Sequence, residues 1–202
     1  MTPQGELVFW DTQGSGNAWK VRVVLAQLAI PHRVVRVNLL NDEAATPEYL
    51  ALNPFGRVPF IRQGGFSLSE SGAILCWLAR GTKLLPADPE GFALVQQWIC
   101  FEQNQLGAAV SSQRWLRRRQ PDGPNTPSVM AFMRDKTDAA LGVLDRHLAA
   151  RDFLVGPDYT VADAQLYAYT QLSEPLGHRP RALPGLARWL ERVASTPGFI
   201  PI

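Results

Sequence analysis

The sequence predicts an α/β domain followed by an all-α domain, and three observations support this. Over residues 1–80, short apolar runs alternate with helical patterns in the order β-α-β-α-β-β-α. Residues 81–90, which include Pro86 and Pro89, have the composition of a linker. Beyond the linker no segment alternates as a strand does, and the apolar spacing is helical. We therefore expect a first domain over 1–80, a linker over 81–90 and a helical domain over 91–202.

The first three elements form a β-α-β unit. Periodicity and boundaries predict a strand over 7–10, an amphipathic helix over 18–29 and a strand over 34–37. The turn cluster Gly14-Ser15-Gly16-Asn17 marks the start of the helix, and Pro31 follows its end. Two strands joined through a helix must run parallel, with a right-handed crossover.

A short helix, a hairpin and a third helix complete the first domain. Thr46-Pro47-Glu48 starts the short helix, with proline in its first turn, and Asn53-Pro54 stops it. Residues 58–61 and 66–68 are predicted to be strands that pair antiparallel across Gln63-Gly64-Gly65. Residues 71–80 return to helical spacing.

The second domain contains helices predicted over 90–119, 128–150, 160–172 and 185–195. A stretch rich in proline and glycine separates the first two. Thr160-Val161-Ala162-Asp163 fits a capping box, with aspartate in place of glutamate or glutamine. This pattern predicts a structural and not a catalytic role for Asp163.

The composition of the chain excludes or disfavours several classes of function. The 20 basic and 18 acidic residues give a net charge of +2, and nucleic acid is disfavoured as a partner because its binders need a basic face. The two cysteines, Cys76 and Cys100, exclude a disulfide framework and a cysteine-rich zinc site, and their apolar neighbours predict buried thiols. The three histidines show no metal-ligand spacing. No apolar run approaches the ~20 residues of a membrane helix, and the start lacks a signal-peptide pattern, so we expect a soluble cytoplasmic protein without a membrane partner.

Four segments together resemble one known family. They are Ser15-Gly16-Asn17, the run Asn53–Pro59, the run Ser69–Leu78 (with Trp77 where the family usually has tyrosine), and Thr160–Asp163 preceded by Phe153-Leu154-Val155-Gly156. In this order and at these separations they resemble the glutathione transferase superfamily, most closely bacterial members of serine type. The resemblance covers essentially the whole chain. It implies a thioredoxin-like first domain, a helical second domain, a homodimer and a role in detoxification.

The resemblance implies that Ser15 activates the glutathione thiol. That thiol has a reference pKa near 8.5, so only a small fraction is the nucleophilic thiolate at neutral pH. A hydroxyl that donates a hydrogen bond to the thiolate lowers the thiol pKa, and the start of a helix favours an anion. Asn17 is the alternative donor, and Ser15 as a plain N-cap is the structural alternative. The absence of cysteine from this segment argues against disulfide reduction through a protein thiolate.

Five further residues are expected to bind glutathione. Glu70 would hold the ammonium of the γ-glutamyl group, and Ser71 would help the helix N-terminus hold its carboxylate; helix capping alone is the alternative. Arg57 would pair with the glycyl carboxylate, or else be a solvated surface residue. The resemblance implies that Pro59 follows a cis bond and that the backbone of Val58 pairs with the cysteinyl unit.

The second substrate, a small hydrophobic electrophile, is expected between the domains, facing Ser15. Four residues of the 90–119 helix are candidates to line that site, with ordinary helical core as the alternative: Phe101, Ser111, Ser112 and Trp115. Phe55 stands where some family branches insert an aromatic side chain into the partner subunit, and packing within its own loop is the alternative.

The leading hypothesis is a glutathione transferase that uses glutathione as a co-substrate, with no other cofactor and no metal. A non-catalytic protein-interaction module on the same fold is an alternative, disfavoured because Glu70 and Ser71 remain. A glutathione-dependent isomerase, dehalogenase or peroxidase would use the same glutathione site and differ in the electrophile site. The sequence alone does not identify the electrophile.

Overall fold

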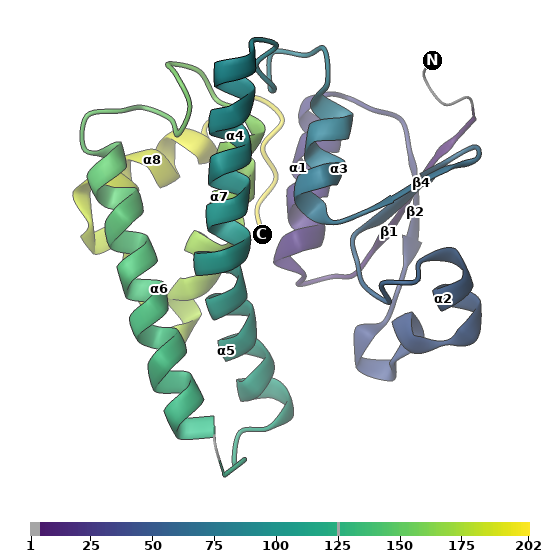
Figure 1. The fold of residues 1–202 in the computed structure, drawn as a ribbon, viewed down its shortest axis with the longest axis horizontal. Helices are drawn as coiled ribbons and strands as arrows, with labels where there is room; N and C mark the ends of the chain where they lie inside the picture. Colours follow the sequence, from purple (N-terminus) through teal and green to yellow (C-terminus); the bar gives the residue numbers. More distant parts are fainter. Residues whose placement is uncertain (1–4, 125) are drawn as a thin grey trace. The chain divides into compact units, whose positions relative to one another are not determined.

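The computed structural model describes residues 5–124 and 126–202, which form two compact units (Figure 1). Unit 1 contains the chain up to Gly81 together with Pro197–Ile202, and unit 2 spans Thr82–Thr196. By their contacts the last six residues belong to unit 1, whereas we expected them within the helical domain.

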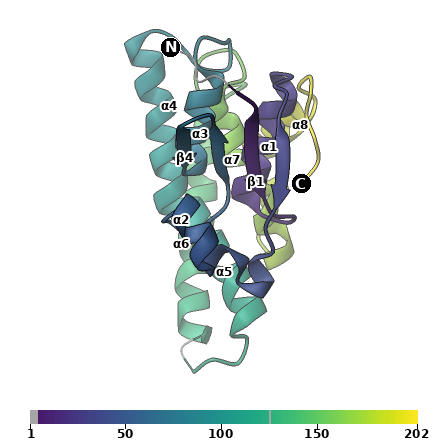
Figure 2. The same cartoon turned by 90° about the vertical axis from the view of Figure 1, so that its right-hand side faces the viewer.

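Unit 1 is built on a four-stranded mixed sheet in the order β2-β1-β3-β4. The strands, which lie side by side in Figure 2, are β1 Leu7–Asp11, β2 Arg33–Arg36, β3 Phe60–Gln63 and β4 Phe66–Ser69. Strands β1 and β2 are parallel, with Phe9 opposite Val34, and β3 is antiparallel to both β1 and β4. The predicted parallel pair and the predicted antiparallel hairpin are both confirmed.

The helices of unit 1 are α1 Gly16–Gln27, α2 Pro47–Leu52 and α3 Ser71–Ala79, with short 3₁₀ turns at Leu39–Asn41 and Glu43–Ala45. Figure 1 shows α1 and α3 together on one face of the sheet, where they pack against each other. As predicted, α2 starts after Thr46 with Pro47 in its first turn, and the structure adds that the Thr46 hydroxyl caps the helix.

Helix α1 is buried on more than the one face that its apolar spacing predicts. Trp19 and Val23 are as deeply buried as the predicted Val21 and Val24. The C-terminal residues cover Trp19: its ring packs edge-on against Phe199, and its Nε1 donates to the Ile200 carbonyl at 2.9 Å. The apolar surface of α1 therefore has two partners, the rest of the unit's core and the tail.

Unit 2 is helical, as predicted. Its helices are α4 Pro89–Phe101, α5 Gly107–Arg119, α6 Thr126–Leu148, α7 Val161–Ser173 and α8 Pro184–Ala194, with 3₁₀ turns at Glu174–Leu176 and Pro180–Ala182. The predicted single helix over 90–119 is interrupted by a π-helical segment, Glu102–Leu106. Helix α7 is buried along almost its whole length and forms the centre of the unit.

The capping box at the start of α7 is confirmed. Asp163 is fully buried, and its carboxylate accepts hydrogen bonds from the Thr160 and Leu154 amides at 3.0 Å each and from Trp189 Nε1 at 2.9 Å. These bonds join the N-terminus of α7 to the preceding loop and to α8. Burial raises the pKa of Asp163 to about 6, because desolvation outweighs the hydrogen bonds that favour the charged form.

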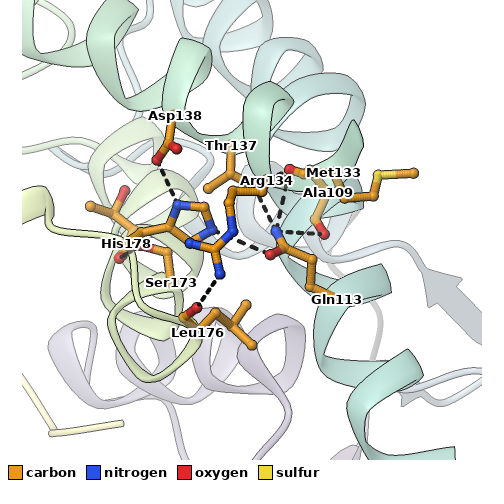
Figure 3. A network of polar contacts seen from close by, with 10 residues as sticks. Ala109, Gln113, Met133, Arg134, Thr137, Asp138, Ser173, Leu176 and His178 are labelled. Carbon is orange, nitrogen blue, oxygen red and sulfur yellow. Dashed lines mark hydrogen bonds and ion pairs between the residues drawn. The ribbon is translucent and has the colours of Figure 1, made fainter. Parts of the chain in front are cut away.

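A second buried polar network joins α5, α6 and the segment after α7 (Figure 3). Gln113 Nε2 donates to Thr137 Oγ1 at 2.9 Å, and Gln113 Oε1 lies 3.3 Å from His178 Nε2. The other ring nitrogen of His178 lies 2.6 Å from Asp138 Oδ1. Both nitrogens of this buried ring therefore have polar partners within hydrogen-bond distance, which explains why a histidine fits inside unit 2.

The prediction of buried thiols is wrong for Cys100, which is exposed, and Cys76 is only partly buried. Helix α4 buries the face that carries Val95, Trp98 and Ile99, and Cys100 lies off that face. Within residues 5–124 and 126–202, no group of His, Cys, Asp or Glu could hold a metal ion. No helix in that part of the chain is long and apolar enough to cross a membrane.

Candidate functional site

The predicted thiol-activating residues lie where β1 ends and α1 begins. Ser15 is the N-cap of α1, and its Oγ accepts a hydrogen bond from the Ala18 amide at 3.2 Å. Because the hydroxyl acts there only as an acceptor, its proton is still available to a ligand. The capping role and the proposed activating role are therefore compatible.

Asn17 joins the first turns of two helices. Its Oδ1 accepts from Lys20 Nζ at 2.8 Å and from Ser71 Oγ at 3.4 Å. Ser71 opens α3, and it is almost fully buried. The structure thus brings together three residues, two of which we predicted as site residues. Lys20 was missed, because a lysine in a helix is ordinarily assigned to the solvated face; its position three residues after Asn17 was the available signal.

The N-terminus of α3 has the features of an anion site. No side chain caps this helix, whereas α1, α2 and α7 have hydroxyl caps. The preceding Glu70 is exposed and has a φ of +68°, an unusual conformation for a residue other than glycine. The first N–H groups of a helix bind carboxylates, and Glu70 stands beside them as a carboxylate suited to an ammonium.

The loop before β3 is held by its own hydrogen bonds. The Val58–Pro59 peptide bond is cis, which confirms the prediction for Pro59. Tyr49 Oη and Asn53 Nδ2 both donate to the Arg57 carbonyl at 2.7 Å. Burial raises the pKa of the Tyr49 phenol, so it stays a donor at neutral pH. Val58 is buried, and Arg57 is exposed and accessible to a ligand carboxylate.

The backbone conformation, and not a ligand contact, requires glycine at position 56. Its φ is +57°, and a Cβ there would lie 3.1 Å from both the Ala44 carbonyl oxygen and Leu50 Cδ2. A side chain at this position would be strained and crowded. The neighbouring Phe55 is 63% exposed, so it does not pack within its own loop.

The four electrophile-site candidates all lie on α4 and α5 of unit 2. The Phe101 ring packs edge-on against Trp98, and Ser111 Oγ donates to the Ala108 carbonyl of its own helix at 3.2 Å. Ser112 is partly buried. Trp115 is 52% exposed, so the alternative of ordinary helical core does not hold for its ring.

A cavity of about 660 Å³ lies elsewhere in unit 1, at the start of β1. It is lined among others by Glu6, His32, Trp77 and Arg80. None of the predicted site residues contributes to it.

Two family models match the chain. The model for "Glutathione S-transferase, N-terminal domain" matches residues 14–80, and that for "Glutathione S-transferase, C-terminal domain" matches residues 109–197. All the predicted glutathione-site residues fall within the first match.

Individual proteins agree with the family models. Glutathione S-transferase 3 of Zea mays is 31% identical over 195 residues, which cover 92% of this chain and 87% of that protein. A crystal structure of a possible glutathione S-transferase from Rhodopseudomonas palustris is 36% identical with a TM-score of 0.90, covering 96% of this chain and 89% of that one. The glutathione S-transferase from Pseudomonas fluorescens Pf-5 is 31% identical with a TM-score of 0.91, covering 96% and 98%.

Proposed function

Because the chain belongs to the glutathione transferase family of enzymes, we propose that it binds glutathione in unit 1 and stabilises the thiolate for attack on a small hydrophobic electrophile. The matches confirm the resemblance to the glutathione transferase superfamily, the fold class and the assignment as an enzyme of this family. The residue roles and the electrophile are our proposals.

The observation that carries the proposal is the junction of α1 and α3 at Asn17 and Ser71. Glutathione has a carboxylate at its γ-glutamyl end and a thiol in its middle. The uncapped start of α3 supplies N–H donors for the carboxylate. The first turn of α1 supplies the Ser15 hydroxyl for the thiolate, together with the positive end of a helix. One bound molecule can use both helix ends because Asn17 links them.

The remaining contacts follow from the loop before β3 and from Glu70. The exposed Arg57 would pair with the glycyl carboxylate, and the Val58 backbone, beside Pro59, would pair with the cysteinyl unit. The Glu70 carboxylate would hold the γ-glutamyl ammonium. With glutathione fixed at both ends, the reaction gains from proximity and thiolate stabilisation and needs no covalent enzyme intermediate.

For the electrophile we propose the surface formed by Phe101, Ser111, Ser112 and Trp115. Phe101 and the half-exposed Trp115 supply aromatic surface, which suits a hydrophobic substrate. Detoxification of such compounds is the role that we propose.

We also propose a homodimer in a reducing compartment, the cytoplasm. The exposed apolar side chains Leu40, Leu50, Leu52 and Phe55 lie on one segment of unit 1, and such surfaces commonly mark protein contacts. Neither Cys76 nor Cys100 forms a disulfide, as expected where thiols stay reduced. Analytical ultracentrifugation at micromolar concentration tests the dimer, and Phe55→Glu should shift it toward monomer.

Calorimetry and a conjugation assay in the same sample test the enzymatic proposal. Wild type should bind glutathione and conjugate it to a generic aromatic electrophile. Ser71→Ala should weaken binding, whereas Ser67→Ala, the same change at an exposed position of β4, should not. Ser15→Ala should lower kcat more than affinity, and Ser15→Thr should restore it. No binding by wild type at millimolar glutathione would refute the proposal.

A further inference from the structure

Lys20 is a fully buried charged side chain that donates a hydrogen bond to Asn17, a residue of the proposed glutathione site. Among the described residues, no other lysine or arginine is buried. Transfer of an ammonium group out of water is costly unless specific contacts compensate for it. One such contact joins Lys20 to Asn17, a residue of the proposed site.

The contact with Asn17 fixes the orientation of that side chain. Lys20 Nζ lies 2.8 Å from one atom of the Asn17 amide, and Ser71 Oγ lies 3.4 Å from the same atom. An ammonium group has donors and no acceptor. The amide atom that faces it must therefore be the oxygen, and the N–H₂ group must point the other way.

The N–H₂ group of Asn17 is consequently available to a ligand. Both hydrogen bonds of this side chain among the described residues fall on its oxygen. Asn17 stands in the first turn of α1, two residues after Ser15. The sulfur of a glutathione molecule bound at this turn would have two hydrogen-bond donors, the Ser15 hydroxyl and the Asn17 amide.

We propose that Lys20 is a positioning residue, which holds and polarises the Asn17 side chain so that its N–H₂ group donates to the thiolate of bound glutathione. The inference rests on the proposed function, because the sulfur is placed there by that proposal. It assigns a role to both alternatives left open by the sequence: Ser15 and Asn17 donate together. A donor polarised by a cation is stronger than a neutral amide in a site shielded from water.

A purely structural lysine would give a different result. Its removal would lower stability and leave the ionisation of bound glutathione unchanged. A positioning lysine, in contrast, sets how strongly Asn17 stabilises the anion. Its removal should raise the pKa of the bound thiol, and this pKa is read from the ultraviolet absorbance of the thiolate or from the pH profile of kcat/KM.

The test compares Lys20→Met with Lys20→Arg, and uses Lys83→Met as the matched control at an exposed lysine. In Lys20→Met the thiol pKa should rise by about one unit, which lowers kcat/KM about tenfold below that pKa. Lys20→Arg should restore most of the effect, and Lys83→Met should have none. Adding Lys20→Met to Asn17→Ala should change kcat/KM less than twofold, because the two residues act as one unit.

Asn17→Asp keeps the test decisive if Lys20→Met does not fold. The aspartate retains an oxygen for Lys20 and Ser71 but has no N–H₂ group, so the thiol pKa should rise in a folded protein. An unchanged thiol pKa in folded Lys20→Met, or in Asn17→Asp, would overturn the inference. The wild type separates this inference from the proposed function. If the pKa of the glutathione thiol does not change when wild type binds it, the proposed function is wrong. If that pKa falls in wild type and is the same in the variants, only the role of Lys20 is wrong.

Discussion

Replacement of Asp163 by alanine should destabilise unit 2 substantially. Its carboxylate accepts from three N–H groups, those of Leu154, Thr160 and the Trp189 ring. A buried donor that loses its acceptor costs about 1–3 kcal/mol. The carboxylate's removal leaves room for about one water, which would serve some of these donors and bring the cost toward the lower end. We therefore expect a loss of about 3 kcal/mol, from about 1 kcal/mol for each donor.

Urea denaturation followed by tryptophan fluorescence measures this loss. Asp158→Ala removes an exposed carboxylate from the loop just before α7 and should change stability by less than about 0.5 kcal/mol. Asp163→Asn keeps one acceptor oxygen, so its loss of stability should lie between those of Asp163→Ala and Asp158→Ala. If Asp163→Ala unfolds within about 1 kcal/mol of wild type, the donors do not depend on the carboxylate and the reasoning fails.

Three further outcomes follow from the structure. Because the pKa of Asp163 is raised to about 6 in the folded state, the folded state binds more protons than the unfolded state below that pH. Stability should therefore fall by about 1 kcal/mol from pH 5 to pH 7 in urea titrations of wild type and not of Asp163→Asn. Gly56→Ala should cost about 1–2 kcal/mol because of its positive φ, and calorimetry should show weaker glutathione binding as the Val58 loop shifts. Gln113→Leu should cost about 2–3 kcal/mol in urea, because His178 and Thr137 lose a buried partner; a neutral effect would show that the network is dispensable.

Much of the fold could be predicted from local patterns. Short apolar runs between turn residues located the strands, and the proline and capping signals at Thr46 and Thr160 located helix starts. The π-helical segment at Glu102–Leu106 could not be predicted, because one extra residue in a helical turn hardly changes the apolar spacing.

The candidate site, too, could be predicted from the sequence only in part. Residues that form a contiguous motif, such as Val58-Pro59 and Glu70-Ser71, could be proposed from the resemblance. The contact between Asn17 and Ser71 joins residues far apart in the chain and appears only once α1 and α3 pack together. Lys20 was missed because its full burial is a property of the folded protein that helical spacing alone does not show.

The tail that covers Trp19 makes unit 1 discontinuous along the chain. During synthesis the sheet and its helices leave the ribosome early, but Phe199 and Ile200 emerge only after all of unit 2. The contacts of Trp19 with Phe199 and Ile200 can therefore form only after the helical unit has been translated. An affinity tag fused after Ile202 would likewise be attached to unit 1, so it belongs on a flexible spacer.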